Sequence, residues 1–118
     1  MFSKLFCEHE FVYIDKEYIE HFPGRDEYLF RFMCRKCKKK KYISSLYIEK
    51  IYDRFVRSVN EMIIIDGFVD ASKTNFILPS RCGSFHCCKK FTGYAADKTM
   101  EYFKNKYSID ITQIRDDF

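Results

Sequence analysis

The sequence is poor in several residue types and lacks the long apolar segments of membrane and secreted proteins. Its 118 residues include no Trp, only four Gly and only two Pro. No stretch approaches the roughly 20 consecutive apolar residues of a transmembrane helix. The first ten residues carry Lys4, Glu8 and Glu10 and have no apolar core long enough for a signal peptide. We therefore expect a protein of the cytoplasm, or of the host cytoplasm if the source is a virus, with no membrane association.

Catalytic signatures are missing as well. The sequence contains no G-x-S-x-G motif, no P-loop, no H-E-x-x-H motif and no dinucleotide fingerprint. Its carboxylates are scattered without an evident histidine partner. We therefore expect a protein that is not an enzyme, with cysteine-dependent activity in segment 82–88 as the one alternative.

The chain is instead rich in aromatic and apolar residues. Thirteen Phe and nine Tyr give an aromatic fraction of 19%, and 47% hydrophobic residues are enough for the core of a single domain over 1–118. Lys, Ile, Phe, Tyr and Asp are frequent where Ala, Gly and Pro are scarce. That bias is typical of AT-rich genes and indicates a low-GC bacterium, a phage or a large DNA virus as the source.

Two close pairs of metal-binding residue types stand in the first third of the chain. Cys7 and His9 form a C-x-H pair, and Cys34 and Cys37 form a C-x2-C pair, with 24 residues between the two pairs. In a reducing compartment such residues are ligands or thiols, and this spacing suits a tetrahedral Zn²⁺ site. Four protein ligands leave no open position, so the site would be structural. The other interpretation is a redox pair of Cys34 and Cys37, which lacks the usual βαβ context.

These pairs, Cys7-Glu8-His9 and Cys34-Arg35-Lys36-Cys37, resemble a zinc ribbon over residues 5–43. The pattern departs from the commonest ribbon in its C-x-H first pair and in Lys38, which stands where a Gly often follows the second pair. The resemblance implies a binding or scaffolding role in proteins linked to nucleic acid or transcription. Zinc ribbons occur in many settings, so the resemblance alone does not define a function.

A second group of potential ligands lies in a Gly-containing segment. It consists of Cys82, His86, Cys87 and Cys88, with C-x3-H and C-x4-C spacings. One loop seldom supplies four ligands, because adjacent cysteines point in different directions. The alternatives are buried thiols that fill core space and a nucleophile activated by neighbouring cations. The sequence therefore predicts one zinc ion, or two if this group also binds metal.

The net charge of +4 is unevenly distributed. Residues 1–60 hold 13 Lys/Arg against 9 Asp/Glu, whereas residues 61–118 hold 8 against 8. The excess lies beside the second cysteine pair, in Arg35, Lys36, Lys38, Lys39, Lys40 and Lys41, followed by Tyr42. These cations could follow phosphates, and Tyr28, Phe30 or Phe32 could stack on unpaired bases. An acidic protein surface would suit the same cations, and a solvated edge strand is the simplest alternative.

Periodicity predicts the elements of the first half. Extended segments over Glu10–Glu20, Tyr28–Cys34 and Lys39–Ile43 favour an antiparallel sheet, with a turn at His21–Asp26. Tyr28, Phe30 and Phe32 alternate and should share one face of that sheet. Ser44 or Ser45 can cap a helix whose apolar residues recur at helical spacing from Ile48 to Val59.

The second half is predicted to be mixed. Asp66-Gly67 suits a tight hairpin between a strand at Glu61–Ile65 and a strand beginning at Phe68. A strand at Asn75–Leu78 should end at Pro79, with a loop over 80–93. Ala96, Met100, Phe103 and Tyr107 indicate a second helix, and Ile109–Ile111 a last short strand.

Together these features predict an α+β fold. A zinc-stapled antiparallel β-ribbon over 5–43 would be joined to a remainder, 44–118, in which two helices pack on a small antiparallel sheet. We expect a small regulatory or adaptor protein that engages nucleic acid, or a nucleic-acid-processing complex, through the basic segment. The alternative is an interaction protein that inhibits a host protein without binding nucleic acid.

Overall fold

The computed structural model describes residues 8–20, 26–82 and 85–114, and for 81, 82 and 85–87 it describes the backbone alone. The elements in chain order are β1 (Phe11–Ile19), β2 (Glu27–Cys34), β3 (Lys40–Ser44), α1 (Ser45–Asp66), β4 (Asn75–Cys82), β5 (Phe85–Thr92), α2 (Gly93–Tyr107) and the short 3₁₀ helix η2 (Ile111–Gln113). Strands β1, β2 and β3 form one antiparallel sheet in that order, and β4 and β5 form a second one.

The three-stranded sheet follows the predicted alternation. Along β2 every second residue is buried, and the buried row consists of Tyr28, Phe30, Phe32 and Cys34. This row packs against α1 and forms the centre of the core. The aromatic face is therefore confirmed, but Phe30 and Phe32 have no exposed surface. They are not available to stack on bases in this structure.

Helix α1 begins where the serine cap predicts. The Ser44 side chain accepts a hydrogen bond from the Leu46 N–H, and the Ser45 hydroxyl accepts one from the Tyr28 N–H of β2 at 2.9 Å. The buried stripe Ile48, Ile51, Tyr52 and Val59 faces the rest of the molecule. The cap and the sheet contact together fix the start of the helix next to β2.

The predicted strand pair around Asp66-Gly67 is wrong. Helix α1 continues through Glu61–Ile65 to Asp66, and Gly67 ends it with φ +65°, where its N–H reaches the Ile63 carbonyl. A positive φ at Gly serves a helix C-terminus as well as a hairpin, so the dipeptide did not discriminate between them. Ile64 and Ile65 are 82% and 77% exposed, as expected for the outer face of a helix that extends beyond its packing partners.

The predicted loop over 80–93 is also wrong. Strand β4 runs through Pro79 to Cys82, and β5 returns antiparallel to it, with Asn75 opposite Thr92 and Cys82 opposite Phe85. Every strand of a two-stranded sheet is an edge strand, and edge strands tolerate proline. The side chains of Leu78 and Phe91 are buried in the core and attach this hairpin to the rest of the molecule.

Helix α2 is confirmed, but Ile109–Ile111 is not a strand. Gly93 starts α2 with φ +72°, and the Tyr94 N–H donates to the Asp70 carboxylate at 2.9 Å. The helix ends at Ser108 in the left-handed region, after which the chain turns into η2. Ile109 and Ile111 are fully buried, so their apolar character reflects the core and not a sheet.

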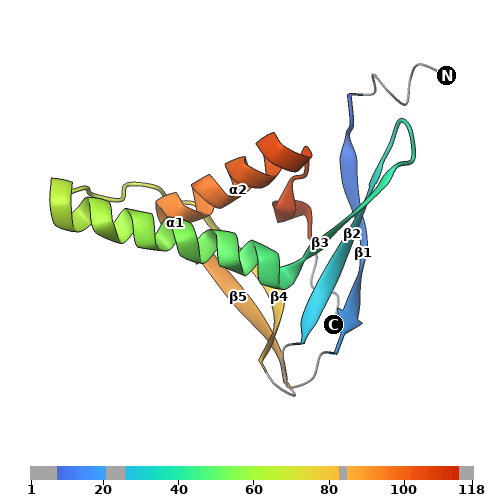
Figure 1. Cartoon of the computed structure of the whole chain (residues 1–118), viewed down its shortest axis with the longest axis horizontal. Coiled ribbons are helices and arrows are strands. Elements are labelled where there is room, and N and C mark those ends of the chain that lie inside the picture. The colour runs from blue at the N-terminus through green and yellow to red at the C-terminus, as the bar shows by residue number, and fades with distance from the viewer. Residues whose placement is uncertain (1–7, 21–25, 83–84, 115–118) are drawn as a thin grey trace.

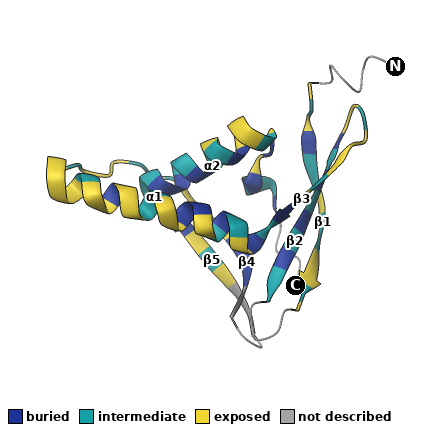
Figure 2. Cartoon of the chain, viewed as in Figure 1, coloured by how far each residue is buried: buried dark blue, intermediate teal, exposed yellow. Residues whose placement is uncertain are grey.

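The elements form an α+β fold with two helices and two small antiparallel sheets, which confirms the predicted class. Figure 1 shows α1 and α2 beside each other, with the β4–β5 hairpin under them. The three-stranded sheet lies at the end of the molecule opposite to the C-terminal end of α1. Burial concentrates along β2 and the facing sides of the helices, whereas the far end of α1 is exposed (Figure 2). Within the described residues, neither helix combines the length and apolar character needed to cross a membrane.

Candidate metal centre and its surroundings

Three of the four predicted ligands meet at one end of the three-stranded sheet. His9 lies just before β1, Cys34 ends β2, and Cys37 belongs to the turn that leads to β3. Their donor atoms all lie within 4.8 Å of one another, and His9 Nδ1 is 3.4 Å from Cys37 Sγ. Cys7, the fourth predicted ligand, lies outside the described residues. The structure thus contains a His/Cys/Cys group that could hold a metal ion.

Strand pairing brings the two halves of this group together. Phe11 pairs with Cys34 in the β1–β2 register, and the Arg35 N–H donates to the Glu10 carbonyl at 3.0 Å. The segment that carries His9 is thereby held beside the end of β2. The predicted returning hairpin is the element that closes the gap of 24 residues between the pairs.

The turn after Cys34 is closed by two backbone hydrogen bonds. The Lys38 N–H donates to the Cys34 carbonyl at 3.0 Å, and the Cys34 N–H donates to the Lys39 carbonyl at 2.9 Å. Lys38 itself adopts φ +64°, which L-residues other than Asn and Asp rarely do. A lysine therefore occupies the left-handed position of this turn, which a glycine would adopt without steric cost.

The surroundings of the Cys34 sulfur favour its thiolate. Burial would by itself raise the pKa of Cys34, but N–H groups of Cys37, Glu10 and Lys36 and the His9 side chain lower it to about 5. The Glu10 N–H lies 3.4 Å from the sulfur. A thiolate is the metal-binding form of cysteine, so these surroundings suit Cys34 as a metal ligand.

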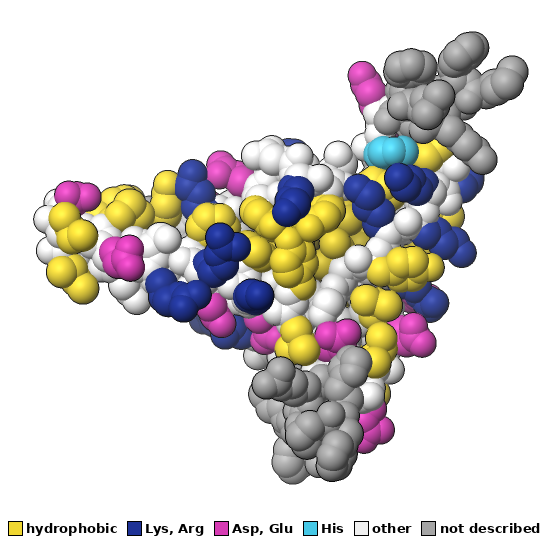
Figure 3. Space-filling model, viewed as in Figure 1, with side chains coloured by type: hydrophobic (Ala, Val, Ile, Leu, Met, Phe, Trp, Pro, Cys, Tyr) yellow, Lys and Arg dark blue, Asp and Glu magenta, His cyan; other side chains and the backbone are white. Residues whose placement is uncertain are grey.

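The basic run beside the metal-binding group is largely exposed. Arg35, Lys36, Lys38, Lys39 and Lys40 are all exposed, and we call these five residues the basic knuckle. Tyr42 is 52% exposed on β3. Figure 3 shows several cationic side chains close to the histidine at this end of the molecule. Within the basic knuckle, Arg35 alone has an ion pair to another described residue, a long one of 3.9 Å to Glu10.

Lys41 differs from the rest of the basic run. Its ammonium donates to the Tyr107 carbonyl at 3.0 Å and lies 4.7 Å from the centre of the Phe11 ring. Partial burial, followed by the charge of Lys39, lowers its pKa. Lys41 therefore connects β3 to the end of α2. These internal contacts give Lys41 a structural role that does not require the predicted partner.

The second predicted metal group lies on the β4–β5 hairpin. Cys82 ends β4, while His86, Cys87 and Cys88 belong to β5, with Cys88 opposite Pro79. The side chains of Cys82, His86 and Cys87 lie outside the described part of the structure. Cys88 is exposed, and among the described side chains Cys34, Cys37 and Cys88 form no disulfide bond.

A cluster of tyrosines joins the two helices, and the sequence interpretation missed it. The Tyr47 hydroxyl lies 2.6 Å from that of Tyr102 and 2.9 Å from that of Tyr107, and the Lys106 ammonium donates to Tyr102 at 3.1 Å. The helical spacing of Tyr102 and Lys106 is a weak local signal. Tyr47 is 55 residues away from Tyr102, so no local pattern could have placed it there.

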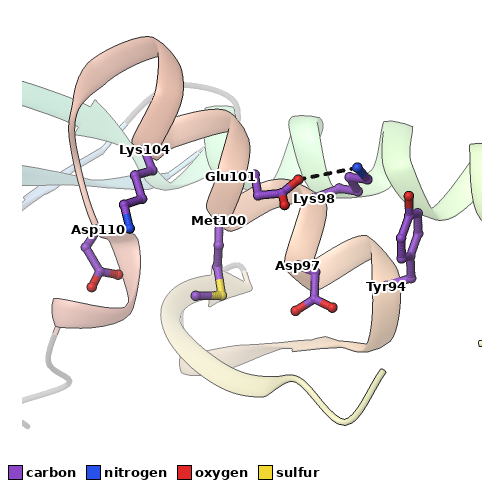
Figure 4. Close-up of a pocket in the computed structure, with 7 residues that line it drawn as sticks. All are labelled: Tyr94, Asp97, Lys98, Met100, Glu101, Lys104 and Asp110. Atoms are coloured by element: carbon purple, nitrogen blue, oxygen red, sulfur yellow. Dashed lines mark ion pairs between the residues drawn. The ribbon is translucent and has the colours of Figure 1, made fainter. Parts of the chain in front are cut away.

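A hollow of about 340 Å³ opens on the other side of α2. Figure 4 shows its lining, in which Lys98 pairs with Glu101, Asp110 lies near Lys104, and Asp97 lies on the other side of Met100. Asp97 is occupied by hydrogen bonds from the Ser72 and Thr74 hydroxyls. Side chains of both charge signs line the hollow, and the Asp97 carboxylate already accepts hydrogen bonds from within the protein. The hollow therefore does not favour one class of ligand.

Comparisons with protein-family models, with curated proteins and with solved structures gave no match to this chain. A function for this protein is therefore inferred from the chemistry of the described residues.

Proposed function

We propose that Cys7, His9, Cys34 and Cys37 bind one Zn²⁺ ion and that the protein is a small regulatory or adaptor protein without enzymatic activity. In this proposal the metal holds a zinc-ribbon-like lobe in shape. The basic knuckle of that lobe then engages nucleic acid or a nucleic-acid-processing complex.

The donor set supports zinc over other common cations. Thiolate and imidazole ligands suit Zn²⁺, whereas Mg²⁺ and Ca²⁺ prefer oxygen ligands. A fourth ligand is needed for a closed tetrahedral site, and Cys7 is two residues from His9. With four protein ligands the metal would have no position for substrate, which supports a structural and not a catalytic role.

One observation carries the functional part of the proposal. The turn that supplies Cys34 and Cys37 is the same turn that exposes Arg35, Lys36 and Lys38. A metal ion there would fix the backbone from which these cations project. Preorganised cations lose less conformational entropy when they bind phosphates than cations on a mobile loop.

The metal is tested by elemental analysis of protein purified without added zinc. We expect one equivalent of zinc in the wild type and its loss in Cys34→Ser, with Cys88→Ser as the matched control that keeps the metal. A second equivalent that disappears in Cys88→Ser would instead assign metal to the β4–β5 hairpin. Metal-free wild type with an unchanged melting temperature would contradict the structural site.

Nucleic-acid binding is tested by fluorescence anisotropy with single-stranded DNA and RNA over a salt series. The double variant Lys39→Gln/Lys40→Gln removes two exposed charges of the basic knuckle, and Lys73→Gln/Lys90→Gln removes two exposed charges elsewhere. We expect the first variant alone to lower affinity and to reduce the salt slope by about 1.4, since each single-strand phosphate contact contributes roughly 0.7. Absence of binding at low ionic strength would refute this function.

A second candidate function is inhibition of a host protein by direct contact. It is favoured by the exposed apolar end of α1 and the segment after it, where Ile64, Ile65 and Val69 are 77–82% exposed. Such groups of exposed apolar side chains often mark interaction surfaces. This candidate requires that Ile64→Lys/Ile65→Lys abolishes capture of a host protein, while Lys39→Gln/Lys40→Gln leaves that capture intact.

A further inference from the structure

The tyrosine cluster of Tyr47, Tyr102 and Tyr107 has one hydroxyl proton that no hydroxyl oxygen of the cluster accepts. Three phenols carry three protons, and the two hydroxyl contacts within the cluster use two of them. The Lys106 ammonium can only donate to Tyr102, so it takes up no proton. Among the contacts of the described residues, one phenol proton is thus left without an acceptor.

The contacts of the Tyr102 hydroxyl with Tyr47 and Lys106 suit it to hold this proton. Burial and then hydrogen bonds to Tyr102 and Tyr107 raise the pKa of Tyr47, which fits Tyr47 as a donor. Hydrogen bonds from Tyr47 and Lys106 lower the pKa of Tyr102, which fits Tyr102 as an acceptor from both. A Tyr102 hydroxyl that accepts from both Tyr47 and Lys106 has its own proton available for an outside acceptor.

A cavity borders Tyr102 on the side of α1. It has a volume of about 240 Å³ and is lined by Ile51, Arg54, Phe55, Ser58 and Tyr102. Its lining contains no acidic side chain, and the charges that act on the Tyr102 hydroxyl are those of Lys106 and Arg54. Figure 3 shows cationic side chains beside exposed apolar ones where the two helices meet. The cavity is therefore positive, with an apolar floor from Ile51 and Phe55.

We propose that this cavity binds a phosphate group, held by the Arg54 guanidinium and the Tyr102 hydroxyl of its lining and by the Lys106 ammonium, which lies 3.1 Å from that hydroxyl. Phosphate carries a charge of about −1.5 to −2 and three acceptor oxygens, so it can accept from all three groups at once. The volume of about 240 Å³, below the roughly 300 Å³ of pockets for drug-sized ligands, limits the part of the ligand that enters the cavity to the phosphate and a small attached group.

The phosphate could be free, part of a nucleotide, or part of a nucleic-acid strand. The site does not depend on nucleic-acid binding at the basic knuckle, because it uses other residues on other elements. If the knuckle does bind a strand, a backbone phosphate of that strand is one source of the ligand.

The test is a titration of the full chain with inorganic phosphate at constant ionic strength. Binding is monitored by the NMR signal of the Arg54 side-chain N–H. We expect saturable shifts, and we expect Arg54→Gln and Lys106→Gln each to weaken phosphate binding about tenfold, as is typical for a charged hydrogen bond. Tyr102→Phe should weaken it several-fold with the ring kept. Lys50→Gln, an exposed cation on the same helix that does not line the cavity, should leave it unchanged.

Two results would overturn the proposal. One is a lack of saturable shifts with both inorganic phosphate and a nucleoside monophosphate. The other is an equal loss of affinity in Arg54→Gln and Lys50→Gln, which would show general charge attraction. Loss of oligonucleotide binding in Lys39→Gln/Lys40→Gln, with phosphate binding retained, supports both proposals as separate sites. Phosphate binding by a protein that ignores oligonucleotides supports this site and refutes the proposed function.

Discussion

The Lys41 ammonium donates a hydrogen bond to the Tyr107 carbonyl, 66 residues further along the chain, at 3.0 Å. The same ammonium lies over the rings of Phe11 and Tyr107. It therefore satisfies a carbonyl at the C-terminal end of α2, where a cation also interacts favourably with the helix dipole. This contact joins β3 to α2 and separates Lys41 from the other cations of its run.

Replacement of Lys41 should reduce stability. We expect Lys41→Gln to lower the free energy of unfolding by about 1 kcal/mol, through the lost hydrogen bond and ring contacts. Lys40→Gln, at the neighbouring exposed position, should stay within about 0.5 kcal/mol of the wild type. Urea denaturation of both variants measures the difference. Equal stabilities would show that the contact contributes nothing.

Gly93 should tolerate a side chain less well than Gly67. Both have a positive φ, but a Cβ on Gly93 would overlap the Asp70 carboxylate that accepts from the Tyr94 N–H, whereas a Cβ on Gly67 meets nothing within 4 Å. Gly67→Ala should cost about 1 kcal/mol from backbone strain alone, and Gly93→Ala at least about 1 kcal/mol more. Thermal denaturation compares the two, and a smaller loss in Gly93→Ala would show that the contact between Asp70 and the Tyr94 N–H contributes nothing to stability.

Asp97 should make stability depend on pH in the acid range. Hydrogen bonds from the Ser72 and Thr74 hydroxyls hold its pKa below the usual value of 3.8. A carboxyl with a depressed pKa in the folded state stabilises that state above its unfolded pKa, and this contribution disappears as the pH falls through the folded pKa.

The variant Asp97→Asn should therefore be less stable than the wild type at pH 7, by about 1 kcal/mol for partly exposed hydrogen bonds. The gap should close progressively between about pH 5 and pH 2, which urea midpoints at several pH values can follow. Glu101→Gln on the same helix disrupts only an exposed ion pair and is the control. A gap that stays constant with pH would refute the assignment.

The end of α1 should tolerate polar residues. Because Ile64 is 82% exposed, Ile64→Lys should change the free energy of unfolding by less than about 0.5 kcal/mol. Ile51 is 2% exposed and contacts the core, so Ile51→Ala should cost about 2–5 kcal/mol. Chemical denaturation tests both variants. A large loss in Ile64→Lys would mean that this end of the helix is covered in solution.

Local patterns in the sequence were sufficient for the first half of the fold. The alternation of Tyr28, Phe30 and Phe32 predicted a strand with one buried face, and Ser44 predicted the start of α1. The spacing of His9, Cys34 and Cys37 predicted a shared site, and these three donors do lie together. In each case neighbours along the chain, or two strands joined by one turn, carry the required information.

Local patterns failed where one signal fits two structures. Asp66-Gly67 can close a hairpin or end a helix, and only the continuation of α1 beyond its packing partners decided between them. Pro79 was taken as the end of a strand, but a two-stranded sheet offers it an edge position. The apolar Ile109 and Ile111 belong to the core without being in a strand.

The sequence by itself thus determined which segments alternate, where α1 begins, which donors are spaced for a metal and where the positive charge gathers, because periodicity and spacing act over a few residues or a single hairpin. Only the tertiary structure decided that Lys41 contacts Tyr107, that Tyr47 meets Tyr102 and that Arg54 and Tyr102 border one cavity. These residues come from distant parts of the chain, and their contacts arise from the packing of whole elements, for which neighbouring residues carry no signal.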